Sequence, residues 1–206
     1  MIPLLIATRN IHKTEEIASM LGDAYQVSDL TTLAGAPDVE ETGVTFLENA
    51  ELKAVAISEV TGSLVLADDS GLEVDALDGR PGVYSARYAG PESDDAANNR
   101  KLLSELDGVS ETRRSARFRC VMVLAKDGKI LEDFSGSVEG RLLEKSQGDG
   151  GFGYDPLFVP GGEGKSFAEL GPEIKNELSH RARAMEEVSA WLGAHHGTTG
   201  APPASD

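Results

Sequence analysis

The order of apolar and polar residues divides the chain into short hydrophobic runs and longer amphipathic stretches. The apolar runs over residues 2–7 and 64–67 predict buried strands at 2–7 and 64–68, and residues 25–28 predict a shorter strand. Apolar residues recur at helical spacing over residues 10–21 and 45–60, so we expect a helix in each of these intervals. Strands that alternate with helices in this way are typical of α/β domains.

Polar residues mark the places where these two helices begin. Asn10 suits the N-cap of the first helix, and Gly22 is placed to end it. Thr45 and Glu48 form a capping-box pattern at the start of the second helix. The expected apolar face of the second helix consists of Leu47, Ala50, Ala54 and Ile57.

The second half of the chain contains longer strands. Ser93 is expected to cap a helix that ends near residue 106. Residues 115–126 and 129–139 predict two strands joined by the turn Asp127-Gly128, and we expect them to form a hairpin arm separate from the α/β core. The remaining expected elements are a short strand over 154–159, a short helix within 160–178, and a last helix that starts at Ser179 and buries Met185, Val188 and Leu192.

Length and composition are those of an ordinary globular domain. The 206 residues, of which 40% are hydrophobic and 26% charged, suffice for one generous domain or for two small lobes around one core. We expect residues 1–196 to form a single domain and residues 197–206 to be a disordered tail, since that segment is rich in Gly, Pro and Thr. No apolar run approaches transmembrane length, so no membrane partner is expected.

The net charge of −16 narrows the choice of partners. Such a charge repels phosphate-rich polymers and argues against a broad nucleic-acid surface, but it allows a small anionic ligand in a focused basic pocket. The first residues lack the basic segment and cleavage site of a signal peptide. A single cysteine, Cys120, cannot form an internal disulfide, which fits a reducing cytoplasm.

Two adjacent carboxylates, Asp68 and Asp69, are the most informative feature of the sequence. They follow the apolar run 64–67 and precede Ser70-Gly71, where we expect the backbone to turn sharply. Adjacent acids repel, so placing them at a buried edge is costly unless a cation neutralises them, and such hard oxygen ligands suit Mg²⁺. The alternative is an ordinary polar turn after a strand.

Basic residues stand at the beginning of two predicted helices. Lys13 lies in the first turn of one helix, and His180, Arg181 and Arg183 lie in the first turn of the last helix, where the helix dipole disfavours positive charge. A shared anionic ligand would explain both positions, and Lys175 could join them. The alternatives are an ordinary N-cap with a solvated Lys13, and ion pairs between the last helix and nearby glutamates.

Two further segments are candidates for substrate contact. In residues 150–156 the glycines allow close backbone approach, Phe152 or Tyr154 could stack on a flat ring, and Asp155 could accept hydrogen bonds from a base. The alternative is a Gly-rich connection with core aromatics. Glu40 and Glu41 lie in a polar loop, and Lys53 lies on the polar face of the following helix; each could equally face solvent.

Taken together, these motifs resemble the inosine triphosphate pyrophosphatase family, the Ham1-like or RdgB-like enzymes that remove non-canonical purine nucleotides. The resemblance covers about residues 2–193. Six segments carry it in order: Thr8-x-Asn10-x-x-Lys13-x-x-Glu16; Glu40-Glu41-Thr42-Gly43-x-Thr45-Phe46-x-Glu48-Asn49-Ala50 with Lys53; Ala67-Asp68-Asp69-Ser70-Gly71-Leu72; Gly82-Val83-Tyr84-Ser85-Ala86-Arg87; Gly151-Phe152-Gly153-Tyr154-Asp155-Pro156; and Lys175 with Ser179-His180-Arg181.

The resemblance implies an α/β fold with a central mixed β-sheet flanked by helices, and two lobes with a substrate cleft between them. It also implies a homodimer and Mg²⁺-dependent hydrolysis of ITP, dITP or XTP to the monophosphate and pyrophosphate. By position, Asp69 is expected to be the general base. The expected metal ligands are Glu40, Glu41, Asp68 and Asp69. The expected substrate-binding residues are Thr8, Arg9, Asn10, Ile11, His12, Lys13, Lys53, Ser70, Phe152, Gly153, Tyr154, Asp155, Lys175, His180 and Arg181.

Arg9 departs from the pattern, since many relatives have Gly or Asn there, and its cation could bind phosphate or point outward. Two other functions stay open. A nucleotide-binding sensor without turnover would lack catalytic carboxylates, yet all four are present. A phosphatase acting through Asp68 or Asp69 as nucleophile would need an acid two residues on, and Ser70 occupies that place when counted from Asp68.

Overall fold

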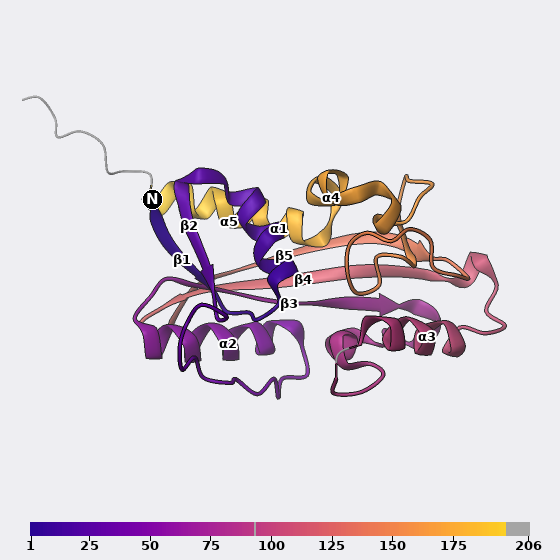
Figure 1. The fold of residues 1–206 in the computed structure, drawn as a ribbon, viewed down its shortest axis with the longest axis horizontal. Coiled ribbons are helices and arrows are strands. Elements are labelled where there is room, and N and C mark those ends of the chain that lie inside the picture. Colours follow the sequence, from indigo (N-terminus) through magenta and orange to yellow (C-terminus); the bar gives the residue numbers. More distant parts are fainter. Residues whose placement is uncertain (93, 197–206) are drawn as a thin grey trace, which may run out of the picture.

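The computed structural model describes residues 1–92 and 94–196. Its centre is one six-stranded sheet with the strand order β2-β1-β3-β4-β5-β6 (Figure 1). β1 runs parallel to both of its neighbours, and the other pairs are antiparallel, so the sheet is mixed. The strands are β1 (Ile2–Ile6), β2 (Tyr25–Asp29), β3 (Val65–Val74), β4 (Ser115–Lys126), β5 (Lys129–Leu142) and β6 (Phe158–Pro160).

Helices cover both faces of this sheet. α2 (Phe46–Thr61) and α3 (Asp95–Glu105) lie on one side, whereas α1 (Ile11–Leu21), α4 (Phe167–Leu178) and α5 (His180–His196) lie on the other (Figure 1). A short 3₁₀ helix, η3 (Gly82–Arg87), packs against β3. This arrangement confirms the expected α/β class. None of the helices among the described residues is long and apolar enough to cross a lipid bilayer.

Local capping signals predicted the helix starts well. The Asn10 side chain accepts hydrogen bonds from the backbone of the first turn of α1, and Thr45 and Glu48 form the predicted capping box of α2. α3 is capped by Asp94, whose side chain accepts from the Ala97 backbone N–H at 3.0 Å. The predicted cap, Ser93, lies outside the described residues, as does the predicted tail 197–206.

The sharp turn predicted after Asp69 is absent, and β3 continues through Ser70 and Gly71 to Val74. The reason lies far away in the sequence, because β4 pairs with β3 over its whole length, from Val65 opposite Ala125 to Val74 opposite Ala116. On its other side β3 pairs with β1 only at Val65 and Leu66. Asp68 and Asp69 therefore lie where the parallel neighbour has ended, beside an opening in the sheet.

The hairpin arm predicted for residues 115–139 is wrong for the same reason. β4 and β5 do form the expected hairpin at Asp127-Gly128, but both belong to the central sheet, and β4 is buried along most of its length. Two smaller corrections concern packing. Leu47 is exposed, and Phe46 is buried at the start of α2 instead. The short strand expected over 154–159 comprises only residues 158–160, since residues 154–157 form a turn.

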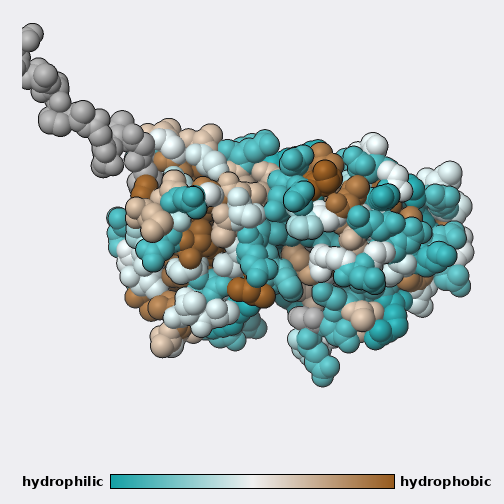
Figure 2. Space-filling model, turned by 45° about the horizontal axis from the view of Figure 1, so that its top comes forward, coloured by the Kyte–Doolittle hydropathy of each residue, from teal (hydrophilic) through white to brown (hydrophobic). Residues whose placement is uncertain are grey.

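Buried apolar residues form separate clusters in the two halves of the sheet. In one half, the side chains of β1 and the start of β3 pack under α1 and α5 on one face and under α2 on the other. In the other half, the end of β3 packs with α3, β5 and Phe167 of α4. Met185, Val188 and Leu192 are buried as predicted. Figure 2 shows a mainly hydrophilic band across the middle of the molecular surface.

Candidate active site

The turn between β1 and α1 is built by short side chains. The Thr8 hydroxyl accepts a hydrogen bond from the Asn10 N–H at 3.1 Å, and Asn10 Oδ1 accepts from the His12 and Lys13 N–H groups at 3.0 and 3.4 Å. These bonds begin α1 next to the middle of β3. Lys13 then extends from the first turn of α1 to Asp68 Oδ1, 2.5 Å away.

Asp68 lies in an almost fully buried ion network. Its carboxylate accepts hydrogen bonds from Arg181 Nε at 2.8 Å, from Lys13, and from the Ser70 hydroxyl at 2.9 Å. Burial alone would raise the pKa of Asp68, but the charges of Arg181 and Lys13 outweigh it and hold the pKa well below its usual range. Asp68 is therefore ionised, and its oxygens are already engaged by protein cations.

Asp69 points the other way from β3 and has a different environment. Its Oδ1 lies 3.1 Å from Lys53 Nζ, and its Oδ2 lies 3.3 Å from Asn49 Nδ2. Burial raises the pKa of Asp69 above its usual value, Lys53 opposes the rise, and the negative charge of Glu41 adds to it. Of the two adjacent acids, Asp69 is thus the more basic, which suits a general base better than Asp68.

Lys53 joins Asp69 to the acidic loop. Its ammonium lies 2.7 Å from Glu41 Oε1, 2.9 Å from the Asp68 carbonyl oxygen and 3.1 Å from Asp69 Oδ1. Burial would lower the pKa of Lys53, but Asp69 and Glu41 raise it, so the cation persists. Three oxygens converging on one cation form a donor set that fits a hard divalent ion.

The four predicted metal ligands differ in their availability. Glu41 and Asp69 share the Lys53 cation, Glu40 is exposed at the rim of the same cavity, and Asp68 is bound to Arg181 and Lys13. Within the described part of the chain, no group of three or more acidic, His or Cys side chains is gathered for metal binding. Glu41 and Asp69 are the pair that fits a metal ion best.

A cavity of about 850 Å³ opens beside these groups. Four cations line it, and each of them contacts an acidic side chain of the polar loop or of β3. The polar and charged lining residues include Thr8, Arg9, Asn10, Lys13, Asp38, Glu40, Glu41, Lys53, Asp68 and Arg87. Its mixture of cations and carboxylates is suited to a polyphosphate with a metal ion, so we call it the polyphosphate cavity.

A smaller cavity of about 110 Å³ adjoins the first, and both are lined by Asn10, Lys13 and Ala86. Phe152 lines the smaller cavity, with the His12 ring stacked at a centroid distance of 5.5 Å and Lys175 Nζ 4.2 Å from its ring centre. We call it the nucleoside pocket. It also contains Ser70, Gly153, Tyr154, Asp155, Lys175, His180 and Arg181.

Buried polar groups fix the walls of the nucleoside pocket. His180 stacks on Phe118 at 4.8 Å, and its burial together with the charge of Arg181 holds its pKa well below the usual range, so the ring is neutral. Asp155 Oδ2 accepts hydrogen bonds from Lys175 and from the Phe152 N–H. The buried Tyr154 donates its hydroxyl to the Ser85 carbonyl oxygen at 2.8 Å, which leaves Phe152 as the ring suited to stacking.

Three residues of the predicted substrate turn differ from the expectation. Ile11 is half exposed and, like His12, lines neither cavity; the His12 ring stacks on Phe152 instead. Arg9 lines the polyphosphate cavity, but its guanidinium binds Asp38 at 3.1 Å and the Ala36 carbonyl oxygen at 3.2 Å. Arg9 thus holds the acidic loop against the end of β1.

Three further residues belong to this site. The sequence assigned no role to Glu16 or Arg87, and for Asn49 it left open whether the side chain faces solvent or a phosphate. Glu16 contacts Arg181 at 2.6 Å and Lys175 at 2.9 Å, Asn49 binds Asp69, and Arg87 binds Glu41. Helical spacing contains a signal for two of them, because Glu16 follows Lys13 by three positions and Asn49 precedes Lys53 by four. Arg87 has no such local signal.

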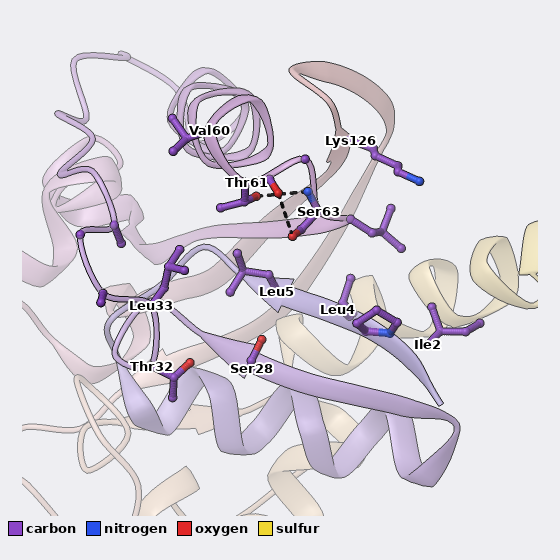
Figure 3. A pocket seen from close by; sticks show the side chains of 16 residues that line it. Ile2, Leu4, Leu5, Ser28, Thr32, Leu33, Val60, Thr61, Ser63 and Lys126 are labelled. Atoms are coloured by element: carbon purple, nitrogen blue, oxygen red, sulfur yellow. Dashed lines mark hydrogen bonds between the residues drawn. The ribbon is translucent and has the colours of Figure 1, made fainter.

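Another cavity, of about 760 Å³, lies near the start of β1 and has different chemistry (Figure 3). Its lining is formed by aliphatic side chains and hydroxyl groups, among them Leu5, Leu33 and Ser63, with Lys126 as the single charged residue. Hydroxyl and backbone groups of Thr61 and Ser63 bind one another there. Without a carboxylate, this cavity lacks the groups that the predicted reaction needs.

Comparison with known proteins shows the family of this chain. A model of the Ham1 family matches residues 4–191. The dITP/XTP pyrophosphatase of Bacillus licheniformis is 50% identical over 190 residues, covering 92% of this chain and 97% of that protein. A protein of the same name from Desulforamulus reducens is 51% identical over 190 residues, covering 92% and 94%.

Solved structures extend the agreement to three dimensions. The Staphylococcus aureus Ham1 protein is 40% identical, with a TM-score of 0.83 over 94% of this chain and 99% of that one. A HAM1 protein from Coxiella burnetii is 39% identical, with a TM-score of 0.84 over 94% and 100%. The predicted resemblance is confirmed, and the chain belongs to the Ham1 family.

Proposed function

We propose that this protein is a Mg²⁺-dependent nucleoside triphosphate pyrophosphatase that hydrolyses dITP, ITP and XTP to the monophosphate and pyrophosphate. Relatives about half identical over nearly their whole length are named dITP/XTP pyrophosphatases. The observation that carries the proposal is the joining of two cavities at Asn10 and Lys13: one is lined by cations and carboxylates, the other by Phe152 and buried hydrogen-bonding groups.

The reaction is an in-line attack of water on the α-phosphorus. The water oxygen forms a bond to phosphorus, the bond from phosphorus to the bridging oxygen of the β-phosphate breaks, and pyrophosphate leaves with that electron pair. Asp69 orients the water and accepts its proton. Its raised pKa and its fixed position between Lys53 and Asn49 support this role.

Charge on the phosphates is balanced by several groups. Glu41 and Asp69, with Glu40 nearby, would hold Mg²⁺, which would neutralise charge on the phosphate oxygens. The Thr8 and Asn10 side chains, in the turn that begins α1, offer hydrogen bonds to the phosphates, and Lys13, which lines both cavities, adds a cation for the α-phosphate.

Hydrogen bonds to the base decide which nucleotides the nucleoside pocket accepts. Hypoxanthine and xanthine have an oxygen at position 6, and adenine has an amino group there. Lys175 and Arg181 are cationic donors buried beside the neutral His180, so a 6-oxo group finds donors whereas a 6-amino group leaves a buried donor unpaired. Such a mismatch discriminates by about 10²-fold or more. Phe152 stacks on the base, and Ser70 lines the same pocket.

We also propose a homodimer in the cytoplasm, without a nucleic-acid or membrane partner. The net charge of −16 supports the absence of a nucleic-acid surface, and the buried Cys120 forms no disulfide. Light scattering on a gel-filtration column measures the mass directly, and a monomer at micromolar concentration contradicts the dimer.

The decisive experiment measures pyrophosphate release from ITP, dITP, XTP, ATP and GTP, with Mg²⁺ and with a chelator. We expect release from the first three only, and only with Mg²⁺. Binding without release would support a nucleotide sensor. Release of orthophosphate together with a trapped phospho-enzyme would support a phosphatase acting through Asp68 or Asp69.

A further inference from the structure

Arg87 lines the polyphosphate cavity from a different part of the fold than the other cations. Arg9 and Lys13 belong to the segment after β1, and Lys53 belongs to α2, whereas Arg87 ends η3. Its Nη1 lies 3.0 Å from Glu41 Oε2, and a third of its side chain is exposed. The guanidinium therefore sits in the cavity and retains access to solvent.

The backbone that carries Arg87 is held tightly against β3. The Ser85 hydroxyl accepts a hydrogen bond from the Leu72 N–H at 2.9 Å and donates one to the Gly82 carbonyl oxygen at 2.6 Å. A Cβ atom at Gly71 would lie 2.5 Å from that same carbonyl oxygen, so a side chain at position 71 would push η3 away. Gly71 is needed for this close approach and not for a turn.

α3 holds the same segment from the other side. The buried Asn98 donates to the Ala86 carbonyl oxygen at 2.9 Å and accepts from the Ala89 N–H at 2.6 Å. Hydrogen bonds thus hold the backbone just before Arg87, at Ala86, and just after it, at Ala89. A cation held by so rigid a support is pre-organised for a ligand.

The position of Arg87 within the cavity indicates which part of the substrate it meets. Asn10 and Lys13 line both cavities and so mark the junction, where the α-phosphate belongs. Ala86 also lines both, but Arg87 lines the polyphosphate cavity alone. Arg87 therefore lies beyond the junction, on the side away from the base.

Glu41 is the acidic partner of Arg87 in the described chain, and it is shared with Lys53. Lys53 has further acceptors in Asp69 and the Asp68 carbonyl oxygen, whereas Glu41 is the one acidic partner of Arg87 within the described residues, so a ligand that drew Glu41 away would free the Arg87 guanidinium. A guanidinium presents paired N–H donors that match phosphate oxygens.

We propose that Arg87 binds the β- and γ-phosphates of the substrate and the pyrophosphate that leaves, with Glu41 as its partner when no substrate is bound. This inference rests on the proposed function. It adds a phosphate-contacting residue that the β1–α1 turn and α2 do not supply.

The test compares two arginines of one loop region. Arg80 is the matched control, because it lies seven residues earlier, pairs with Glu105 and lines neither cavity. Binding of inorganic pyrophosphate and of inosine monophosphate is measured by calorimetry in Mg²⁺ buffer for the wild type, Arg87→Gln, Arg87→Lys and Arg80→Gln. Thermal unfolding of each variant reports whether it folds.

We expect Arg87→Gln to weaken pyrophosphate binding by about tenfold or more, the loss expected for a charged hydrogen bond, and to change inosine monophosphate binding by less than about twofold. Arg87→Lys keeps the positive charge but lacks the paired N–H donors of the guanidinium, so it should give an intermediate loss of pyrophosphate affinity. If Arg87→Gln fails to fold, Arg87→Lys provides the test. Arg80→Gln should change neither affinity.

Two results overturn the inference. One is pyrophosphate binding by folded Arg87→Gln or Arg87→Lys that equals the wild type, which would leave Arg87 as an anchor of Glu41 only. The other is an equal loss for both ligands, which would indicate a general distortion. If the wild type instead releases no pyrophosphate from any nucleotide, the proposed function itself fails, so the two failures are distinguishable.

Discussion

Arg181 Nε lies 2.8 Å from Asp68 Oδ2, which joins the first turn of α5 to the middle of β3 across 113 positions of sequence. Both side chains are essentially inaccessible to solvent. The same guanidinium also binds Glu16 of α1 at 2.6 Å, so a single buried arginine connects α1, β3 and α5 beside the nucleoside pocket.

Replacing Asp68 by Asn should destabilise the protein strongly. It removes the charge that compensates two buried cations, and the loss of one partner from a buried pair costs about 3–5 kcal/mol. Urea unfolding at pH 7 measures the free energy of unfolding. The pKa of Asp68 is lowered in the folded state, so its stabilisation is present above the unfolded pKa of about 4 and declines as pH falls toward the folded pKa. The difference between variant and wild type should therefore shrink at low pH; an equal stability at pH 7 would contradict the network.

Asp69→Asn should abolish turnover without loss of stability. Removing a general base costs about 10²–10⁴-fold in kcat. The pKa of Asp69 is raised in the folded state, so its contribution to stability is complete below the unfolded pKa and is lost as pH rises through the folded pKa. At pH 7 the ionised Asp69 thus disfavours folding, and the Asn variant should unfold at an equal or higher temperature than the wild type. Turnover near the wild-type rate would refute the role of Asp69.

Glu16→Gln should weaken binding in the nucleoside pocket and leave binding in the polyphosphate cavity unchanged. Glu16 neutralises Lys175 and Arg181 and holds both in place. We expect binding of inosine monophosphate to weaken by about tenfold, the scale of a lost charged hydrogen bond, with pyrophosphate binding unchanged. The matched control is Glu15→Gln, since Glu15 is exposed and its ion-pair partner among the described residues is His12, at 3.8 Å. Equal effects of both substitutions would contradict the prediction.

Asn49→Ala should lower kcat and move its pH dependence. The Asn49 amide donates to Asp69 Oδ2 and accepts from the Gly43 N–H, so it positions the base relative to the acidic loop. Without this donor the ionised Asp69 is less stabilised, and the acidic limb of the kcat profile should shift to higher pH. The control is Asn98→Ala, because Asn98 is comparably buried and its side chain binds the backbone of Ala86 and Ala89. It should lower the unfolding temperature and leave the acidic limb of the kcat profile at the same pH.

Much of the fold was predictable because its signals are local. Asn10, Thr45 and Glu48 bind backbone groups within four positions of themselves, so the starts of α1 and α2 follow from a few neighbouring residues. The apolar runs of β1 and β3 are likewise recognisable without knowing their partners. The basic residues at two helix starts were also noticeable from their unfavourable interaction with the helix dipole, from which a shared anionic ligand was predicted. In the structure, Lys13 and Arg181 share the carboxylate of Asp68.

The extent of β3 and the place of the hairpin required the tertiary structure. Ser70 and Gly71 suggested a turn because Gly favours turns, but pairing with β4 keeps them extended, and Gly71 serves the close approach of η3. Strand pairing depends on residues 50 positions away, which no local pattern encodes.

The sequence by itself determined which residues are chemically capable: adjacent acids, cations at helix starts, and an aromatic residue in a Gly-rich loop. The tertiary structure alone decided which partner, and therefore which role, each of these residues has. It paired Asp68 with Arg181 and Lys13, left Asp69 the more basic acid, directed Arg9 to Asp38 and placed Arg87 beside Glu41. The reason is that the charge state of a buried group depends on which opposite charges lie within a few ångströms, and that is fixed by topology rather than by position along the chain.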